Sequence, residues 1–136
     1  MIKPIVHDPL LLAKKSVPAT MSDRSVVTDL IDTLLYHRKE CVGMAANMIG
    51  VHKRIIVVDH AGMVLAMINP EIVSQSGEYE AEEGCLSLAG VRKTRRFDKI
   101  RVKFTNAMGA THTQDFSGWT AQIIQHEIDH CNGILI

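Results

Sequence analysis

Apolar positions recur at helical spacing over one long segment of the chain, from Asp23 to Lys39. Either Ser22 or Asp23 could cap the start of this segment, because short polar side chains accept hydrogen bonds from the first free backbone N–H groups. We therefore predict an amphipathic helix that packs one face against the core. Its apolar positions are Val26, Val27, Leu30, Ile31, Leu34 and Leu35.

Shorter apolar runs after this helix favour strands. Residues 54–59 and 63–68 are rich in β-branched side chains and are separated by a tight turn, as in a hairpin. Residues 100–105 and 111–116 are also predicted strands, on either side of a turn that contains Asn and Gly. Strands should therefore dominate the middle of the chain.

The two ends of the chain differ from this middle part. Pro4, Pro9 and Pro18 favour an extended N-terminal segment, because proline discourages helix. A final helix begins near Ser117 or Gly118 and carries apolar residues on one face. The fold class is therefore α+β, with the whole chain, residues 1–136, forming a single domain.

Composition supports one compact domain and excludes several functions. The 136 residues are 46% hydrophobic and 22% charged, which is enough apolar material for a core. A net charge of zero argues against a nucleic-acid surface based on bulk charge, so a ribosome contact would need a local patch. The basic run in residues 93–103 fits the solvated face of a strand. Three cysteines, without a signal-like start or an apolar run of membrane-spanning length, predict the cytoplasm.

Residues 125–130 (QHEIDH) contain the pattern HExxH within the predicted final helix. Residues four apart share one helix face, so His126 and His130 can present ring nitrogens to a single metal ion. Glu127 would lie beside the open position of that metal, where a carboxylate serves as general base toward water. The pattern predicts metal-assisted hydrolysis, although a helix with two surface histidines would look the same.

A metal held by two histidines needs a third protein ligand, and the candidate is Cys85 in residues 82–87 (EEGCLS), after a predicted turn. One thiolate and two imidazoles leave a fourth position for water or substrate. Structural zinc sites instead use four protein ligands, often in CxxC pairs, and the chain has no CxxC. Cys41 and Cys131 are expected to be structural thiols.

Three motifs occur in a fixed order: residues 43–48 (GMAANM), 83–87 (EGCLS) and 125–130 (QHEIDH). They resemble the GxGxAAxQ, EGCLS and QHExDH motifs of the peptide deformylases, which remove the formyl group from the N-terminal methionine of nascent bacterial and organellar proteins. The similarity includes connecting segments and extends over nearly the whole chain. It implies β-sheets, mixed or antiparallel, around a central C-terminal helix carrying HExxH, with an N-terminal amphipathic helix.

The resemblance also implies the catalytic roles. Cys85, His126 and His130 would hold one divalent metal ion, and Glu127 would move the proton between water and the departing amine. The backbone N–H of Leu86, which follows the cysteine, would help hold the developing oxyanion. Among the metals that this donor set accepts, the family suggests Fe²⁺, while Zn²⁺, Ni²⁺ and Co²⁺ also fit.

The same resemblance implies the substrate contacts, with N-formylmethionyl peptides as the partner. Gly43 would pair with the backbone of the bound peptide, as an added strand pairs with a sheet edge. Val42 and Ile123 would line the pocket for the methionine side chain. Arg96 aligns with an arginine near the bound peptide.

Met48 marks the main departure from the family pattern, because a glutamine there normally donates its side-chain amide to the formyl oxygen. Methionine cannot donate this bond, and losing one such donor costs about 10²–10³ in turnover. Asn47 has an amide, but neighbours in an extended segment point to opposite sides, so it would reach the site only from a bulged or rotated backbone. Cys41, where the family has its first glycine, is a second departure.

These observations leave one leading interpretation and two alternatives. The leading one is a cytoplasmic metal-dependent hydrolase that removes the formyl group from formylmethionyl polypeptides. A deformylase-like amide hydrolase of altered acyl specificity would also explain Met48. A low-activity pseudoenzyme that binds metal or peptide is the third, and retention of Glu127 argues against it.

Overall fold

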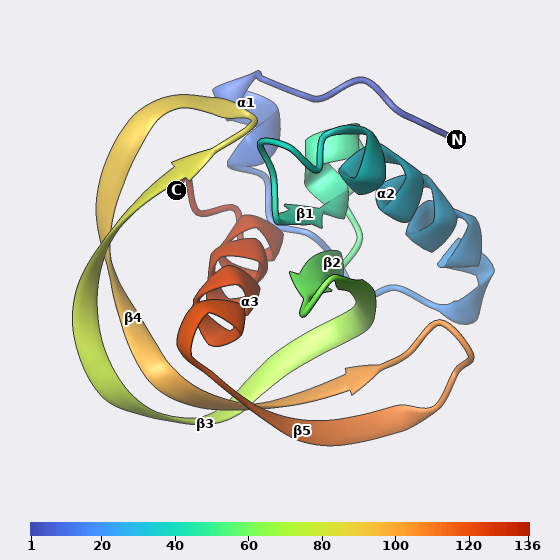
Figure 1. Cartoon of the computed structure of the whole chain (residues 1–136). Helices are drawn as coiled ribbons and strands as arrows, with labels where there is room; N and C mark the ends of the chain where they lie inside the picture. The colour runs from blue at the N-terminus through green and yellow to red at the C-terminus, as the bar shows by residue number, and fades with distance from the viewer.

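A five-stranded antiparallel sheet forms the centre of the computed structural model, which describes residues 1–136 (Figure 1). The strands follow one another in space in the order of the chain, and each pairs with the next in antiparallel fashion. The predicted α+β class is confirmed, and the sheet is wholly antiparallel rather than mixed. The strands are β1 (Gly43–Ala45), β2 (Ile55–His60), β3 (Met63–Cys85), β4 (Leu88–Thr105) and β5 (Thr111–Ser117).

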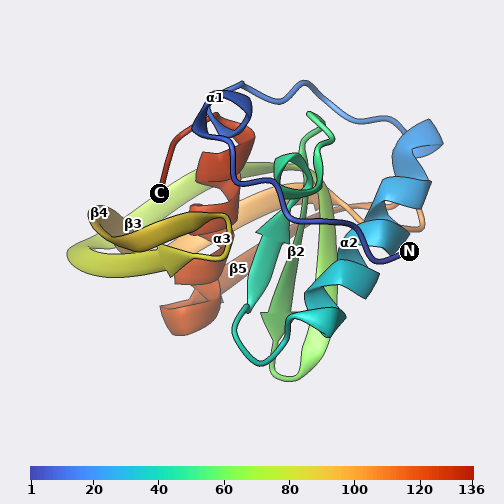
Figure 2. The same ribbon diagram turned by 90° about the horizontal axis from the view of Figure 1, so that it is seen from above.

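Two longer helices cover opposite faces of this sheet. Helix α2 packs on one face of β1 and β2, and helix α3 packs on the other face, enclosed by the curved strands β3 and β4 (Figures 1 and 2). None of the helices has the length and apolar character that a membrane span requires. The helices are α1 (Pro9–Leu12), α2 (Arg24–Tyr36) and α3 (Gly118–Cys131), with 3₁₀ turns η1 (Met21–Asp23) and η2 (Ala46–Ile49).

Strand β2 shows how the sequence produces two cores from one sheet. Its first four residues are all apolar and all buried, because the strand is covered on both faces. Ile56 and Val58 join the cluster around α3, whereas Ile55 and Val57 join the cluster under α2. Successive side chains of a strand point to opposite faces, so one apolar run serves both helices.

The long hairpin of β3 and β4 wraps around α3 (Figure 1). Its register shifts between Ile68 and Glu71, again near Ile72, and at its tip, which are irregularities of the kind that bend and twist a strand pair. At the first shift Asn69 adopts a positive φ of 53°, and its side-chain amide exchanges two hydrogen bonds with the backbone of Ala19. These bends let the hairpin close over the helix that carries the HExxH pattern.

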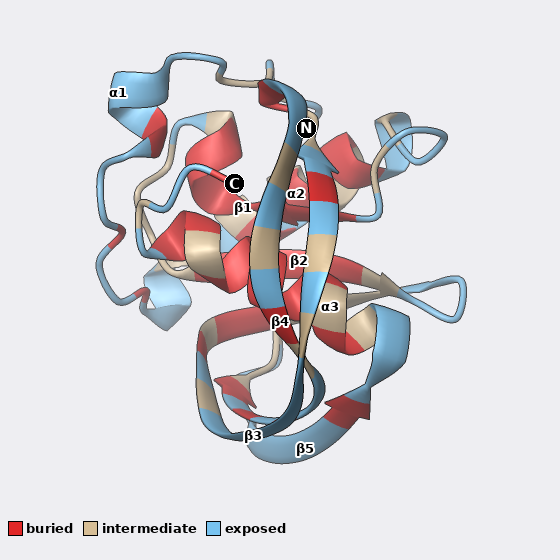
Figure 3. Ribbon diagram, turned by 90° about the vertical axis from the view of Figure 1, so that its left-hand side faces the viewer, coloured by how far each residue is buried: buried red, intermediate tan, exposed pale blue.

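The expected long helices and strands are confirmed, with three differences in extent, but the N-terminal segment is not wholly extended because it contains the short helix α1. The first long helix ends at Tyr36, and the strands expected over 63–68 and 100–105 are parts of the much longer β3 and β4. Figure 3 shows alternating buried and exposed bands along this hairpin, with the basic residues of β4 mostly on the exposed side. Pro9 lies at the first position of the short helix α1, where no backbone N–H is needed, and Asp8 caps it.

Candidate metal centre

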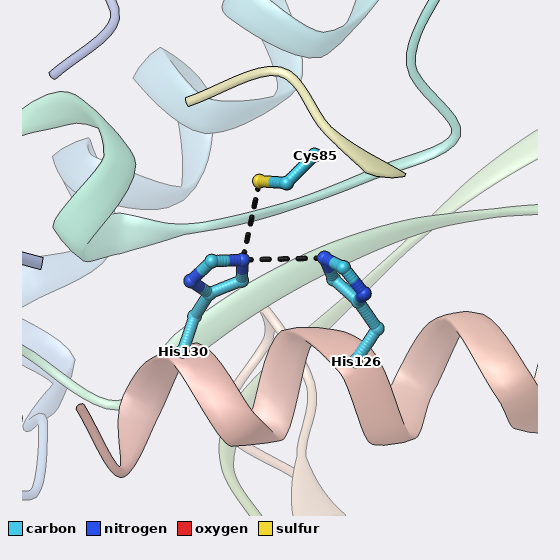
Figure 4. A group of neighbouring side chains, drawn as sticks. All are labelled: Cys85, His126 and His130. Carbon is cyan, nitrogen blue, oxygen red and sulfur yellow. Dashed lines mark hydrogen bonds between the residues drawn. The ribbon is translucent and has the colours of Figure 1, made fainter. Parts of the chain in front are cut away.

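Helix α3 and the end of β3 bring the three predicted ligands together. His126 and His130 lie one turn apart on the same face of α3, and their Nε2 atoms are 3.2 Å apart. The Sγ atom of Cys85 is 3.3 Å from Nε2 of His130, and the three ligand atoms all lie within 4.8 Å of one another (Figure 4). Cys85 is the last residue of β3, so it precedes the two-residue turn at the hairpin tip rather than following a turn as the sequence suggested.

These separations fit a tetrahedral metal ion. With metal–nitrogen bonds of about 2.0–2.1 Å and a metal–sulfur bond of about 2.3 Å, tetrahedral angles place two nitrogens about 3.3 Å apart and nitrogen and sulfur about 3.6 Å apart. The observed 3.2 Å and 3.3 Å are close to these values. Three protein donors would leave a fourth coordination position for water or substrate, as in catalytic sites.

Glu83 fixes the orientation of His126. Nδ1 of His126 lies 2.8 Å from Oε1 of Glu83, and in the neutral tautomer that donates this hydrogen bond the other ring nitrogen, Nε2, is free to bind a metal beside Cys85 and His130. Burial opposes the charge on Glu83, but hydrogen bonds from His126 and Arg96 outweigh it and lower the pKa of this carboxyl to about 2. Glu83 is therefore ionised and aligns the ligand histidine.

His130 is held in its neutral, metal-binding form. Burial lowers the pKa of His130 to about 3, and the residue is fully buried. Asn47 donates a hydrogen bond of 2.9 Å to the backbone carbonyl of His130, which ties this turn of α3 to η2. A neutral imidazole is the form that ligates a metal.

Glu127 lies next to the ligands with a free carboxylate oxygen. The residue is 4% exposed, and its Oε1 has no hydrogen-bond partner in the protein although the side chain lines the pocket. Burial raises the pKa of Glu127 to about 7. A buried, unpartnered carboxyl whose pKa lies near neutrality suits a group that both accepts and returns a proton.

A pocket of about 170 Å³ opens in front of these residues. It gathers most of the predicted site: Val42, Gly43, Met48, Cys85, Leu86, Ile123, His126 and Glu127 all line it. Sequence reasoning assigned no role to two other side chains that line it, Gln122 and the largely exposed Trp119. Gln122 lies four residues before His126, so the helical period could have placed it on the ligand face.

Arg96 does not line this pocket. The side chain is buried beneath it, where Nε and one terminal nitrogen donate to Glu83 at 2.8 Å and 2.6 Å. Its other terminal nitrogen donates to Asp129 at 2.7 Å. In this position Arg96 supports His126 through Glu83. The contact with the bound peptide that the sequence predicted would require the Arg96 side chain to lie elsewhere.

The pocket wall formed by β1 exposes backbone hydrogen-bonding groups. The backbone N–H of Asp59 donates to the carbonyl of Val42, and Gly43 pairs with Val58. In antiparallel pairing, bonded and non-bonded pairs alternate, so the N–H and C=O of Gly43 point away from β2. Because β1 is an edge strand, they are directed to its free side.

Met48 and Asn47 lie in the 3₁₀ turn η2 and not in an extended segment. Met48 lines the pocket, and its sulfur is 3.5 Å from the backbone nitrogen of Ala45. Asn47 turns away, since its amide nitrogen donates to the carbonyls of His130 and Leu12 at 2.9 Å and 3.4 Å. The side-chain amide of Asn47 therefore does not replace the hydrogen-bond donor that Met48 lacks.

A thiol and two imidazoles beside a buried carboxyl at a pocket define a metallohydrolase centre. Residues 2–136 match the family model described as polypeptide deformylase. A peptide deformylase from Clostridium beijerinckii is 52% identical over 136 residues and 100% of both chains. A peptide deformylase from Thermoanaerobacter pseudethanolicus is 39% identical over 92% of this chain and 80% of its own.

Solved structures agree with the sequence comparison. A crystal structure of a peptide deformylase from Legionella pneumophila has a TM-score of 0.90 and 38% identity, over 99% of this chain and 83% of its own. A Met-Ala-Ser-bound class I type b peptide deformylase from Acinetobacter baumannii has a TM-score of 0.89 and 28% identity, over 99% and 97%. The chain belongs to the peptide deformylase family and is a metallohydrolase.

Proposed function

We propose that the protein, with residues 1–136 acting as one catalytic domain, removes the formyl group from the N-terminal formylmethionine of nascent polypeptides. The observation that carries this proposal is that the three metal ligands lie together, with Cys85, His126 and Glu127 lining one pocket that the edge strand β1 also lines. The Acinetobacter relative holds Met-Ala-Ser, a peptide that begins with methionine. We further propose the cytoplasm as the location, from the cysteine content. A transient ribosome contact stays a prediction.

Cys85, His126 and His130 would hold the divalent metal. When bound, the metal supplies Lewis acidity, which acidifies water and polarises the scissile carbonyl. Glu83 and Asn47 hold the two histidines through Nδ1 of one and the backbone of the other. The donor set accepts Fe²⁺, Zn²⁺, Ni²⁺ or Co²⁺, and we propose Fe²⁺ as the physiological ion from the family resemblance.

Glu127 would move the proton. Its unpartnered Oε1 can accept the proton of the attacking water, and the raised pKa lets the same group hold that proton and then return it to the departing amine. Formate and the free α-amino group are then released. This use explains why a carboxylate is buried in the pocket without a partner.

Fewer side-chain donors are available to the developing oxyanion than the family pattern supplies. The backbone N–H of Leu86, beside the ligand Cys85 in the hairpin turn, is the donor that we propose. Met48 offers none, and the amide of Asn47 is engaged elsewhere. We therefore expect the protein to turn over its substrate more slowly than it would with a side-chain donor at position 48.

The substrate would enter as an added strand. The N–H and C=O of Gly43, which β2 does not use, would pair with the peptide backbone, while the side chains of Val42 and Ile123 would contact the methionine. Such pairing selects linear peptides, because only an extended backbone can match the edge. Peptide side chains beyond methionine would lie toward the open rim.

Deformylation of formyl-Met-Ala-Ser by anaerobically prepared, metal-loaded protein tests the proposal. Wild type should release formate, and Glu127→Gln should lose about 10²–10⁴-fold in turnover while retaining metal, since only the proton acceptor is removed. Met48→Gln should raise turnover, up to about 10²-fold, if the missing donor limits the rate.

Two outcomes would contradict the proposal or redirect it. Metal-loaded, folded wild type and Met48→Gln that both fail to release formate would overturn the deformylase assignment and favour a binding role. An inactive wild type beside an active Met48→Gln would favour the alternative that Met48 reshapes the acyl pocket, and a series of N-acyl methionyl peptides would then identify the preferred group.

A further inference from the structure

A chain of hydrogen bonds leads from the β3–β4 hairpin to the metal ligand His126. The hydroxyl of Tyr79 donates to Oε1 of Gln122 at 3.1 Å, and Nε2 of Gln122 donates to Oε2 of Glu83 at 2.9 Å. Glu83 in turn accepts from Nδ1 of His126 at 2.8 Å. The metal centre is therefore connected to Tyr79, three residues removed along this chain of contacts.

Gln122 completes the hydrogen bonding of Glu83. Arg96 supplies one donor to each carboxylate oxygen, which is the forked contact that fixes the carboxylate plane. The second donor to Oε1 is His126, and the second donor to Oε2 is Gln122. Each oxygen of Glu83 thus accepts two hydrogen bonds. The bond from Gln122 to Oε2 matches the bond from the ligand His126 to Oε1 and helps to hold the carboxylate in place.

The amide of Gln122 is set by Tyr79. A glutamine amide can rotate by 180°, which would direct its oxygen toward the carboxylate. The hydroxyl of Tyr79, which donates to the amide oxygen, and Glu83, which accepts from the amide nitrogen, select the same orientation. Tyr79 faces Arg96 across the hairpin, so both reach α3 from one side of the sheet.

Gln122 lines the pocket, but both ends of its amide are engaged by protein groups. We infer that Gln122 is a positioning residue, which with Tyr79 fixes Glu83 and thereby holds His126 in the geometry that retains the metal. The inference rests on the proposed metal-dependent function. It assigns Gln122 no contact with the reacting atoms and no hydrogen bond to the peptide.

The test compares Gln122→Met and Tyr79→Phe with wild type and with Tyr36→Phe, an exposed tyrosine outside the network. Methionine keeps the length and the apolar stem of glutamine but offers no donor. Each protein is loaded with Co²⁺, and the visible absorption, the rate of cobalt loss to a chelator, and kcat and KM for formyl-Met-Ala-Ser are measured.

Mutating a group that hydrogen-bonds a ligand histidine typically lowers metal affinity or activity by about 10–100-fold. Gln122 lies one hydrogen bond further from the histidine, so we expect a loss near the lower end of this range. We expect Gln122→Met to lose cobalt about 10-fold faster, with an altered absorption band, a similar fall in kcat and a KM within about 2-fold. Tyr79→Phe should change the same quantities by about 3-fold, and Tyr36→Phe should match wild type.

Other results would overturn the inference. A higher KM with unchanged kcat and cobalt loss would make Gln122 a direct peptide contact. Lower thermal stability with unchanged cobalt loss and absorption would make its role merely structural. Failure of wild type itself to retain cobalt would instead overturn the proposed metal site, so the two failures are distinguishable.

Discussion

The two walls of the pocket hold their groups in different ways. On the wall made by α3 and β3, polar and charged side chains satisfy one another: Glu83 is hydrogen-bonded to His126, Arg96 and Gln122. On the wall made by β1, the functional groups are the backbone N–H and C=O of Gly43, which β2 leaves unpaired, and the neighbouring Met48 offers no hydrogen-bond donor. A hydrogen-bond network positions the functional groups of the first wall, whereas the backbone conformation of β1 positions those of the second.

This difference predicts how each wall fails. Removing one member of a buried charged network leaves the others without partners, so the expected loss is in stability and metal retention. Adding or removing atoms at a backbone edge changes what fits against it, so the expected loss is in turnover or substrate binding. Substitutions on the α3–β3 wall should therefore change stability and metal retention, whereas substitutions on the β1 wall should change turnover or substrate binding.

The largest effect is expected from Arg96→Met. The substitution leaves the buried Glu83 without its forked partner and frees Asp129, and breaking such a pair typically costs about 3–5 kcal/mol. The midpoint of denaturant unfolding, measured at saturating metal, should fall accordingly. Metal should also be lost faster, because Glu83 orients His126.

Arg101→Met is the matched control, because Arg101 pairs with Asp115 on the surface, where both side chains are more than half exposed. Exposed pairs contribute little, so this variant should unfold near the wild-type midpoint. Equal behaviour of the two variants would contradict the claim that the buried network around Glu83 stabilises the α3–β3 wall.

A smaller effect, on turnover, is expected from Gly43→Ala. A Cβ there would lie 2.7 Å from Cγ2 of Ile123 and 2.9 Å from Oε2 of Glu127, both closer than side chains tolerate. Ile123 and Glu127 must give way, and because a misplacement of about 1 Å near a reacting group can cost about 10²-fold in rate, we expect a loss of about 10-fold from this smaller shift. Formate release at saturating peptide measures the loss.

Gly84→Ala controls for the mere addition of a methyl group at the pocket wall. Its Cβ would meet only the carbonyl of Gly90, at an ordinary 3.6 Å. If this variant loses as much turnover as Gly43→Ala, contact with Glu127 is not the reason that residue 43 is glycine.

The sequence predicted the metal triad because the features that define it are local. Helical periodicity places His126 and His130 on one face, and only one cysteine had a setting suited to a third ligand. The two long helices and the first hairpin were likewise readable from periodicity over short windows. The turn of that hairpin contains Ala61 and Gly62, both at positive φ, as tight hairpin turns require.

The supporting wall was not predictable in the same way. Residues 71–99 form most of a long hairpin, but one side of it faces solvent and its sequence is largely polar, so apolar periodicity is weak there. Arg96 stands in a basic run that is otherwise mostly exposed, and its burial depends on carboxylates from β3 and α3. Such contacts depend on how the hairpin bends around the helix, which no local pattern encodes.

The smallest effect is expected on the β1 wall from Cys41, whose thiol donates to the carbonyl of Gly43 at 2.9 Å. Burial raises the pKa of Cys41 to about 12, so the thiol stays protonated and keeps this bond. A peptide N–H that pairs with the carbonyl of Gly43 would compete with the thiol for the same oxygen. Cys41→Ala should therefore lower KM for formyl-Met-Ala-Ser by about 2–5-fold with kcat unchanged, which corresponds to one weak hydrogen bond. Cys41→Ser, with a stronger donor, should raise KM, and a shift of both variants in the same direction would show that the thiol does not compete with the peptide.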